Sequence, residues 1–581
     1  MKEIVSIKTI KQSYFLWKVS LLSFLILTLN FELFGQGDGT GLNNSLLISE
    51  VEVEVDHLSE TGQKDLLIST ILNSLKIFPN EHARRSDIDI AIQRVIAMPE
   101  ISDVSYDLEL STGISYRLHL RVNTLKEGLL KESASGLFTK GGKNFPYLYN
   151  SQNFKLKVDL GGTISPVGGW NTWLNNGDFF TEFSPFGKDY PPNNRFMGLE
   201  SAFYVGLTAV IKITEKTFLY GNYKLLLAST LGRDLYRKDN PYSVLTENLY
   251  GGIVGSIPFS RGNILNYNLS VGKQPYRIGT GMLLNQIALN GGDRGALNVW
   301  PRFSGDFVGL AQFRYNNLRL EYFYINPSEF GGFETNTRLT GINLDYSKLS
   351  KFKAGFTYLH VPQSTSIYLF PGNIFESRNK LNAFNLRAEL DPKPRKKSLI
   401  AKIDLGLQTN RRFPMRAHGI AMELGYLKGS HKNRPSLSYR FSHLSGDDPE
   451  TERFERWDFL YSGNDVDTWI QGLIMKNILF NTNLQAHRIQ GQMIAKGYRL
   501  TAQYFYFRSS QLNNLPLVIN EFASNELAHQ ATVLAEKSFN RRLYMRLQIH
   551  SLWSIEGING ALPLPVKNPW IGTQAMIKYQ I

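Results

Sequence analysis

The sequence predicts an all-β transmembrane barrel of about 18 antiparallel strands, with 16 as the alternative, preceded by a small α+β domain. Segments of eight to twelve residues that alternate apolar and polar side chains recur about every 24 residues from Phe154 onward. Tyr, Phe and Trp gather at the ends of these segments, as a membrane-interface girdle requires. The sequence ends on such a segment, with the apolar Ile581 last, and a long irregular segment, Ser165–Arg195, is expected after the first strand. Because one soluble sandwich holds far fewer strands, a barrel is favoured.

Residues 1–35 are expected to be an export signal. Four lysines precede the apolar run Val19–Leu29, which has the length of a secretion signal and is too short for a spanning helix. An uncleaved anchor is the alternative, which Lys18 and Glu32 disfavour because they shorten the run. A glycine-rich linker is expected at 36–44, and removal of the signal would change the formal charge from +14 to +12.

Residues 45–124 predict a separate domain with the element order β-α-α-β-β. Alternating strands lie around Val53, Tyr106 and Leu118, and two helix-spaced apolar runs follow the N-cap candidates Ser59 and Ser86. Residues 125–152 are expected to be a second linker, and 153–581 the barrel.

The stretch IDIAIQRVIAMPEISDVSYDLEL (Ile88–Leu110) resembles the second helix and second strand of a POTRA domain, the module that precedes the barrels of outer-membrane assembly factors and two-partner secretion transporters. The resemblance implies a periplasmic domain that binds a protein partner through a strand edge. An α+β spacer without a partner is the alternative.

The placement of charge along the strands indicates a polar lumen. A Lys or Arg that faces lipid near the bilayer midplane costs about 2–4 kcal/mol, so the polar phase must face inward. The cations in that phase are Lys155, Lys157, Arg319, Lys353, Arg387, Lys402, Arg440, Arg499, Arg546 and Lys578. They outnumber the acids Asp159, Glu321, Asp345, Glu389 and Asp404 about two to one, which predicts a wet, net positive wall.

Composition excludes several other classes of protein. The absence of cysteine excludes disulfides, thiolate metal sites, a cysteine nucleophile and a lipoprotein anchor. No Gly-x-Ser-x-Gly or His-Glu-x-x-His motif occurs, and the ten histidines have no ligand spacing, so neither an enzyme, a metal nor a cofactor is expected. Nucleic acid is not an expected partner, because the positive charge is placed inside the barrel.

Two runs resemble segments of the alginate export family of outer-membrane porins: VGKQPYRIGTGMLLNQIALNGGDRGALNVW (Val271–Trp300) and GDDPETERFERWDFLYSG (Gly446–Gly463). Matching positions are Gly272, Lys273, Gln274, Gly292, Asp293, Arg294, Gly446, Asp447, Asp448, Thr451, Glu455 and Phe459. Lys273 stands where arginine is usual, and a POTRA-like domain does not usually precede this family. The resemblance implies export of an anionic polysaccharide from a barrel held in outer-membrane lipid.

A polyuronate is best served by weak basic sites in series, since each unit must leave as readily as it enters. Lys273, Arg277 and Arg294 are the candidates for the narrow part. The candidates for the ladder along the wall are Arg319, Arg387, Lys402, Arg440, Arg499 and Arg546. The alternative is that each cation pairs with a lumen carboxylate. Asp447 and Asp448 are expected to form a solvated acidic loop rather than a calcium site.

Three other functions stay open at this stage. The domain at 45–124 is compatible with a protein secretion or assembly transporter. A plugged barrel that displays polymer, of the capsule-assembly kind, would not conduct. An uptake porin for small anionic oligosaccharides would have the same lumen charge, because charge does not record the direction of transport.

Overall fold

The structure is a computed structural model that describes most of the chain from residue 45. Described are 45–56, 68, 71–72, 75, 77, 81–84, 88, 91–92, 95, 101–112, 115–124, 147–151, 153–173 and 195–580, the last apart from 215–216, 236–239, 260–263, 316–317, 330–333, 349–351, 371–373, 391–396, 429–432, 434, 464–470, 496–497, 515–518, 520, 539–542 and 563–565. The predicted signal at 1–35, the linker at 36–44 and most of the linker at 125–152 lie outside the described residues.

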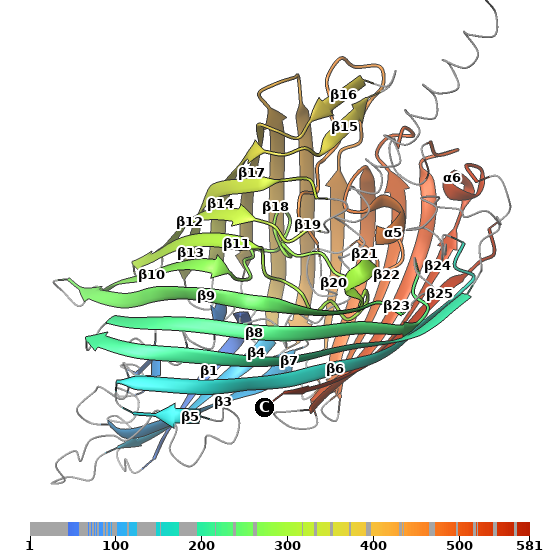
Figure 1. Ribbon diagram of the computed structural model, residues 1–581. Coiled ribbons are helices and arrows are strands. Elements are labelled where there is room, and N and C mark those ends of the chain that lie inside the picture. The colour runs from blue at the N-terminus through green and yellow to red at the C-terminus, as the bar shows by residue number, and fades with distance from the viewer. Residues whose placement is uncertain are drawn as a thin grey trace, which may run out of the picture.

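Eighteen long antiparallel strands close into one barrel, which confirms the predicted fold class (Figure 1). They are β6 (Phe154–Trp170), β7 (Arg195–Thr214), β8 (Thr217–Gly232), β9 (Tyr242–Pro258), β10 (Ile264–Lys273), β11 (Phe307–Tyr315), β12 (Leu318–Asn326), β13 (Arg338–Lys348), β14 (Phe352–Gln363), β17 (Leu381–Leu390), β18 (Lys397–Asn410), β19 (Arg416–Lys428), β20 (Ser436–Leu444), β21 (Leu484–Ala495), β22 (Tyr498–Ser509), β23 (Glu526–Ser538), β24 (Leu543–Ser554) and β25 (Trp570–Gln580).

The barrel closes where the last strand pairs with the first long one. Antiparallel pairs between β25 and β6 run from Ile571↔Trp170 to Gln580↔Gly161. A short strand, β5 (Tyr147–Asn150), pairs with β6 at Lys155–Lys157, beyond the reach of β25. A second short hairpin, β15 (Ile367–Phe370) with β16 (Ile374–Ser377), lies in the connection between β14 and β17.

The two faces of the strands differ as the alternation predicts. Along β22 the outward side chains are exposed or half-buried while every second residue is buried. Leu199, Phe203 and Val205 are exposed on the outer face of β7, whereas Glu200 between them is fully buried. An apolar exterior around a polar interior is the arrangement of an outer-membrane barrel. No helix in the part of the chain described here is long and apolar enough to cross a membrane.

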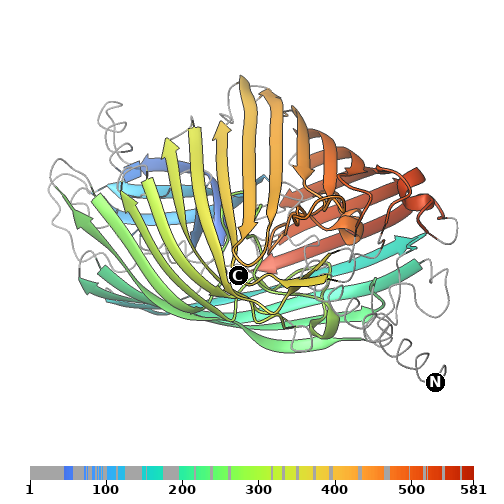
Figure 2. The same cartoon turned by 90° about the horizontal axis from the view of Figure 1, so that it is seen from above.

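The connections are short at one end of the barrel and long at the other (Figure 2). Thr214 pairs with Thr217 at the short end, where Phe154 and Gln580 also lie. At the long-loop end, residues 274–306 join β10 to β11, and residues 445–483 join β20 to β21. This asymmetry is typical of bacterial outer-membrane barrels.

The sequence-based end of the first strand is wrong. An irregular segment was expected from Ser165 to Arg195, but β6 continues to Trp170, which pairs with Arg195. Gly168, Gly169 and Pro166 hide this strand in the sequence, because such residues are uncommon inside strands. Pairing with β7 on one side and β25 on the other provides the ordering that local propensity lacks.

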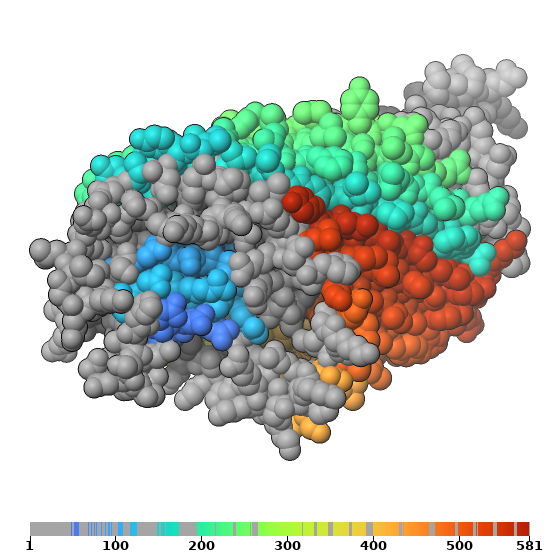
Figure 3. All heavy atoms as spheres, turned by 90° about the horizontal axis from the view of Figure 1, so that it is seen from below, coloured from blue at the N-terminus to red at the C-terminus, as the bar shows by residue number. Residues whose placement is uncertain are grey.

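The N-terminal residues form a separate four-stranded sheet with the order β2-β1-β4-β3. Its strands are β1 (Ser45–Asp56), β2 (Glu81–Arg84), β3 (Ile101–Thr112) and β4 (Ser115–Thr124), with β1 parallel to β4 and β3 antiparallel to it. Described helical residues such as Ile71 and Ile92 pack in its apolar core. Figure 3 shows these residues, in blue, on the lower face of the molecule.

One detail of β1 departs from simple alternation. Ile48 is fully buried, although it belongs to the polar phase of the predicted strand. The pairing of β1 with β4 shifts between Ile48 and Glu50, and such an irregularity reverses which phase faces the core.

Candidate functional site in the barrel lumen

Three segments from the long-loop end fold into the barrel and share one apolar cluster with its wall. We call residues 274–306 the first inner segment, 445–463 the second and 471–483 the third. The cluster joins Met282, Trp457 and Met475 of these segments to inward-facing wall residues such as Phe323 and Phe505. The lumen is therefore occupied by folded chain and has an apolar core of its own.

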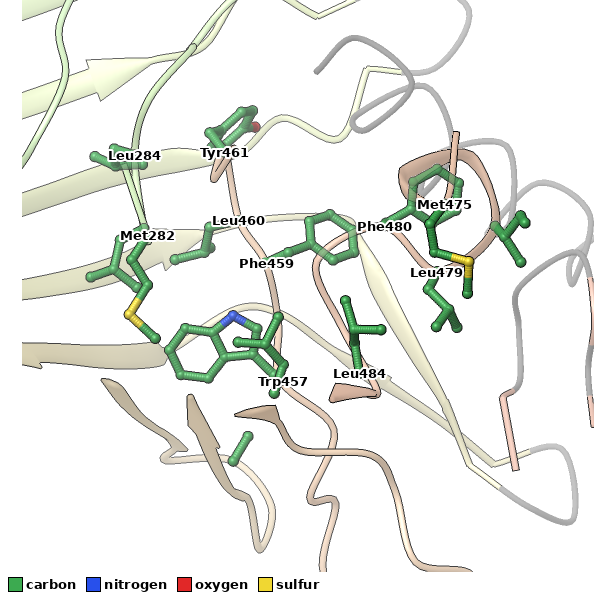
Figure 4. Close-up of a cluster of buried hydrophobic side chains, with 14 of the residues drawn as sticks. Met282, Leu284, Trp457, Phe459, Leu460, Tyr461, Met475, Leu479, Phe480 and Leu484 are labelled. Atoms are coloured by element: carbon green, nitrogen blue, oxygen red, sulfur yellow. The ribbon is translucent and has the colours of Figure 1, made fainter. Parts of the chain in front are cut away.

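The first two inner segments pair with each other. Leu284 forms a parallel bridge with Tyr461, whose carbonyl accepts a hydrogen bond from the Asn285 N–H at 2.8 Å. Gly463 N–H donates to the Gly281 carbonyl at 3.1 Å. Figure 4 shows Met282 and Leu284 beside Leu460 and Tyr461 in this cluster. The two runs that carry the family resemblance thus meet inside the barrel.

Wall carboxylates bind the C-terminal part of the first inner segment. Glu200 on β7 accepts hydrogen bonds from the N–H groups of Asn298 (2.6 Å) and Val299 (2.8 Å). Glu247 on β9 accepts from the N–H groups of Phe303 (2.7 Å) and Ser304 (2.9 Å). Both carboxylates are buried, so these bonds satisfy groups that water does not reach.

The N-terminal part of the same segment is anchored to the opposite side of the barrel. Tyr276 donates its hydroxyl hydrogen to Glu321 on β12 at 3.3 Å, and Thr280 donates to Asp404 on β18. Because its two halves bind strands β7–β9 and β12–β18, the first inner segment crosses the lumen.

A buried ion pair fixes the second inner segment. Asp458 accepts hydrogen bonds from Arg378 Nε at 2.8 Å and Nη2 at 3.2 Å, and from the Tyr368 hydroxyl at 2.6 Å. Its second oxygen also accepts from the Leu460 N–H at 2.8 Å. Arg378 precedes β17 and is 1% exposed, so the pair ties the segment to the wall in a dry environment.

The third inner segment contains the short helix α5 (Lys476–Leu479). Gln530 of β23 accepts hydrogen bonds from the N–H groups of Ile474 and Met475, each at 3.1 Å. The Lys476 ammonium lies 5.0 Å from the ring centre of Trp300, which links this helix to the first inner segment.

The three cations predicted at the narrow part of the lumen all bond to the first inner segment or to the residues that flank it. Lys273 pairs with Asp306, and Arg277 donates to the Thr280 carbonyl at 3.2 Å. Arg294 donates to the carbonyls of Leu289 (3.0 Å) and Ser328 (3.1 Å). These bonds hold the chain of the first inner segment, and the role of the three residues in transport stays a prediction.

Several predicted ladder cations pair with lumen carboxylates. Arg319 contacts Asp345 at 2.6 Å, and Lys402 contacts Glu389 at 3.1 Å. Arg499 donates through Nε to Glu536 at 2.6 Å. Neutralised pairs of this kind retain local polarity but contribute little net field.

Arg387 also binds Asp345, by reaching across an intervening strand. A Cβ built at Gly355 would lie 2.5 Å from the Arg387 guanidinium, so glycine at this position of β14 gives the side chain its path. Asn343 accepts another bond from Arg387 at 2.5 Å. Arg387 is therefore part of a wall network rather than an isolated ladder rung.

The charge of the lumen wall is unevenly distributed around the barrel. Inward positions on β11–β19 hold five cations and five acids: Arg314, Arg319, Lys353, Arg387 and Lys402 against Glu321, Asp345, Glu389, Asp404 and Glu423. Inward positions on β20–β25 hold five cations and one acid: Arg440, Arg488, Arg499, Arg546 and Lys578 against Glu536. We call the second group the basic wall. Arg440, Arg499 and Arg546 were predicted as site residues, whereas Arg488 and Lys578 were not.

The two aspartates of the predicted acidic loop lie in different environments. Asp448 is part of an exposed turn, where its carboxylate accepts from the Glu450 N–H at 3.0 Å. Asp447 is buried and accepts from the Glu455 N–H at 2.9 Å, and its burial raises its pKa to about 6. Within the described residues, no group of three or more His, Asp or Glu side chains could hold a metal ion.

The anchors of the inner segments were missed at the sequence level. Asp458 lies in the second resembling run but is not among its matching positions, and Glu200 and Glu247 come from strands far away in sequence. Glu200 does stand in the inward phase of its strand, which is a usable signal. Its binding partners could not be inferred, because they belong to an irregular segment with no periodicity.

Comparisons with known proteins find similar solved structures at low sequence identity. No protein-family model matches the sequence, and no curated protein matches it. Pseudomonas aeruginosa OccK5 (OpdH) has a TM-score of 0.44 at 9% identity, covering 73% of this chain and 98% of that one. The P. aeruginosa outer membrane protein OpdK gives 0.44 at 10%, covering 73% and 98%. Acinetobacter baumannii OccAB4 gives 0.43 at 10%, covering 74% and 99%.

The resemblances to the alginate export family and to POTRA domains are supported by no family model and stay predictions. What is established is the architecture: a closed 18-strand barrel of the outer-membrane type, with folded segments in its lumen and a small N-terminal sheet.

Proposed function

We propose that this protein is an outer-membrane channel for an anionic solute, with an anionic, alginate-like polysaccharide as the expected cargo. The observation that carries the proposal is the basic wall: strands β20–β25 hold five inward cations and one inward acid, and Glu423 of the adjacent β19 pairs with Arg488. A one-sided excess of positive charge attracts anions along that side of the lumen, whereas the balanced opposite side does not.

Arg488 is the residue of the basic wall best suited to contact cargo. Its Nη2 donates to Glu423 at 2.8 Å, while Nε and Nη1 have no hydrogen-bond partner among the residues described here. A guanidinium with two open donors can bind a carboxylate or sulfate and release it again. Cargo would approach this side chain when the inner segments shift, because Arg488 is 2% exposed in the present arrangement.

The proposed orientation places the short-turn end, and with it the N-terminal sheet, in the periplasm. Bacterial outer-membrane barrels have short periplasmic turns and long external loops. The edge strand β3 would then be open to a periplasmic protein partner, as the POTRA resemblance implies. Crosslinking that traps unfolded polypeptide on residues 45–124 would instead favour a secretion or assembly transporter.

Planar-bilayer recordings test the channel. The expected result is anion selectivity, with current blocked by added polyuronate. Arg488→Gln should lower the ratio of anion to cation permeability, whereas Lys567→Gln, at an exposed position between β24 and β25, should leave it unchanged. Cation selectivity that polyuronate does not affect would refute the proposal.

One observation favours a second candidate, an occluded barrel that binds polymer without conducting. The apolar cluster that joins all three inner segments is the kind of core that stabilises a plug. Negligible conductance with retained polysaccharide binding would identify this function.

A further inference from the structure

The outer face of β19 has charged ends and an apolar middle. Its outward side chains are, in order, Arg416, His418, Ile420, Met422, Leu424, Tyr426 and Lys428. Met422, Leu424 and Tyr426 are 45%, 62% and 47% exposed, as lipid-facing residues are. At about 3.3 Å per residue and a tilt of about 40°, Arg416 and Lys428 are roughly 30 Å apart along the membrane normal. Because the apolar band of such barrels is about 25 Å tall, both cations lie at headgroup level.

Arg416 belongs to a group of exposed cations at the long-loop end of β17–β19. We call Lys380, Arg411, Arg412 and Arg416 the basic rim. Lys380 Nζ donates to the Pro362 carbonyl at 3.3 Å. Within the described residues, no ion pair joins any of the four to a carboxylate. The rim therefore presents fixed positive charge that neighbouring acids do not neutralise by contact.

Imidazole and aromatic rings line the outer face of the strands next to the rim. His418 and His443 approach through their Nε2 atoms at 3.1 Å. Farther round, Phe441, His487, Tyr506 and His529 occupy directly paired positions on β20–β23, and their rings contact one another. Phe441 pairs with Met422 of β19, so this row of rings belongs to the lipid-facing band next to the rim, whereas His418 is the ring that lies two residues from Arg416 on the outer face of β19.

Glu455 is a carboxylate whose charge acts on His418, the neighbour of Arg416 on the outer face of β19. It lies in the second inner segment and pairs with Arg453 at 3.3 Å. Its charge acts on His418 but does not bring an ion pair to Arg416. Among the described residues, the four rim cations are therefore not paired with this carboxylate or with another one.

We infer that the basic rim binds the phosphate headgroups of anionic lipids in the leaflet at the long-loop end. Three of its four members are arginines, whose planar donors bind phosphate in pairs. The side chains lie above an exposed apolar band, so a lipid can place its chains against β18–β19 and its phosphate at the rim. This inference is independent of the proposed channel.

Native mass spectrometry of the full-length protein released from nanodiscs tests the inference. The probe is phosphatidylglycerol, compared with zwitterionic phosphatidylcholine. A triple variant, Arg411→Gln, Arg412→Gln and Arg416→Gln, should retain less phosphatidylglycerol, by about fivefold in affinity for each removed charge. Phosphatidylcholine retention should stay unchanged, as should retention of both lipids by Lys567→Gln, a cation in an exposed loop.

Three results would overturn the inference. The triple variant could retain as much phosphatidylglycerol as the wild type, or it could lose both lipids equally. Millimolar inorganic phosphate could also displace phosphatidylglycerol completely, which would indicate a site for free phosphate. Heat-modifiable gel migration confirms that each variant is folded, and bilayer selectivity should not change, which separates this test from that of the channel.

Discussion

Replacing Asp458 with Asn should release the second inner segment from the wall. Asn has nearly the same size and can accept a hydrogen bond, but it leaves the Arg378 guanidinium buried without its counter-charge. Removing one partner of a buried ion pair typically costs about 3–5 kcal/mol. A loss of that size raises the population of the released segment by roughly a hundredfold to several thousandfold. Trp457, the adjacent buried residue, provides a fluorescence signal for the release.

The assay is urea unfolding in lipid vesicles, followed by tryptophan fluorescence and by protease cleavage in the second inner segment. Asp448→Asn is the matched control, because that half-buried carboxylate accepts its hydrogen bond within its own turn; its expected effect is under about 0.5 kcal/mol. Adding Arg378→Met to Asp458→Asn should recover part of the loss, because no buried charge then stands alone. If Asp458→Asn matches the wild type within about 0.5 kcal/mol and is cleaved no faster, the anchoring role of this pair is wrong.

Three further predictions concern the wall and the inner segments. Gly355→Ala should destabilise the barrel by about 1–3 kcal/mol, since the new Cβ would lie 2.5 Å from Arg387. The control Gly491→Ala should not destabilise it, because the new Cβ would have no atom within 4 Å. Equal urea midpoints for the two variants would contradict this prediction. The pKa of Asp447 is raised to about 6, so the folded segment binds more protons than the unfolded one between about pH 4 and 6. The stability of the second inner segment should therefore fall as pH rises through this window. Asp447→Asn should remove this dependence and flatten the pH profile of proteolysis. Glu247→Ala leaves two buried backbone N–H groups without acceptors, so it should cost about 2–5 kcal/mol and speed cleavage within 274–306; unchanged cleavage would refute that role.

The fold class could be read from the sequence because lipid imposes a strict rule on every strand. A cation such as Arg546 is tolerated only on the inward phase, so a period of two residues assigns each side chain to a face without knowledge of the partner strands. The rule fails where local composition is ambiguous. Glycines and Pro166 concealed the end of β6, which pairing on both sides nevertheless orders.

The candidate site was predictable in its charge and not in its contacts. The excess of cations over acids along inward phases is a property of the sequence, and Arg440 and Arg546 do lie on the basic wall. Pairing was not predictable, because Arg387 reaches Asp345 across β14 only where Gly355 leaves space.

The sequence by itself determined which residues face lipid and which face the interior, because that choice depends on the transfer energy of single side chains. Only the tertiary structure decided that residues 274–306, 445–463 and 471–483 fold into the barrel and pack together. Those segments have no periodicity, and their positions depend on bonds to distant groups such as Glu200, Asp458 and Gln530. Contacts of this kind depend on the closed barrel, which brings the strands that carry them to one lumen.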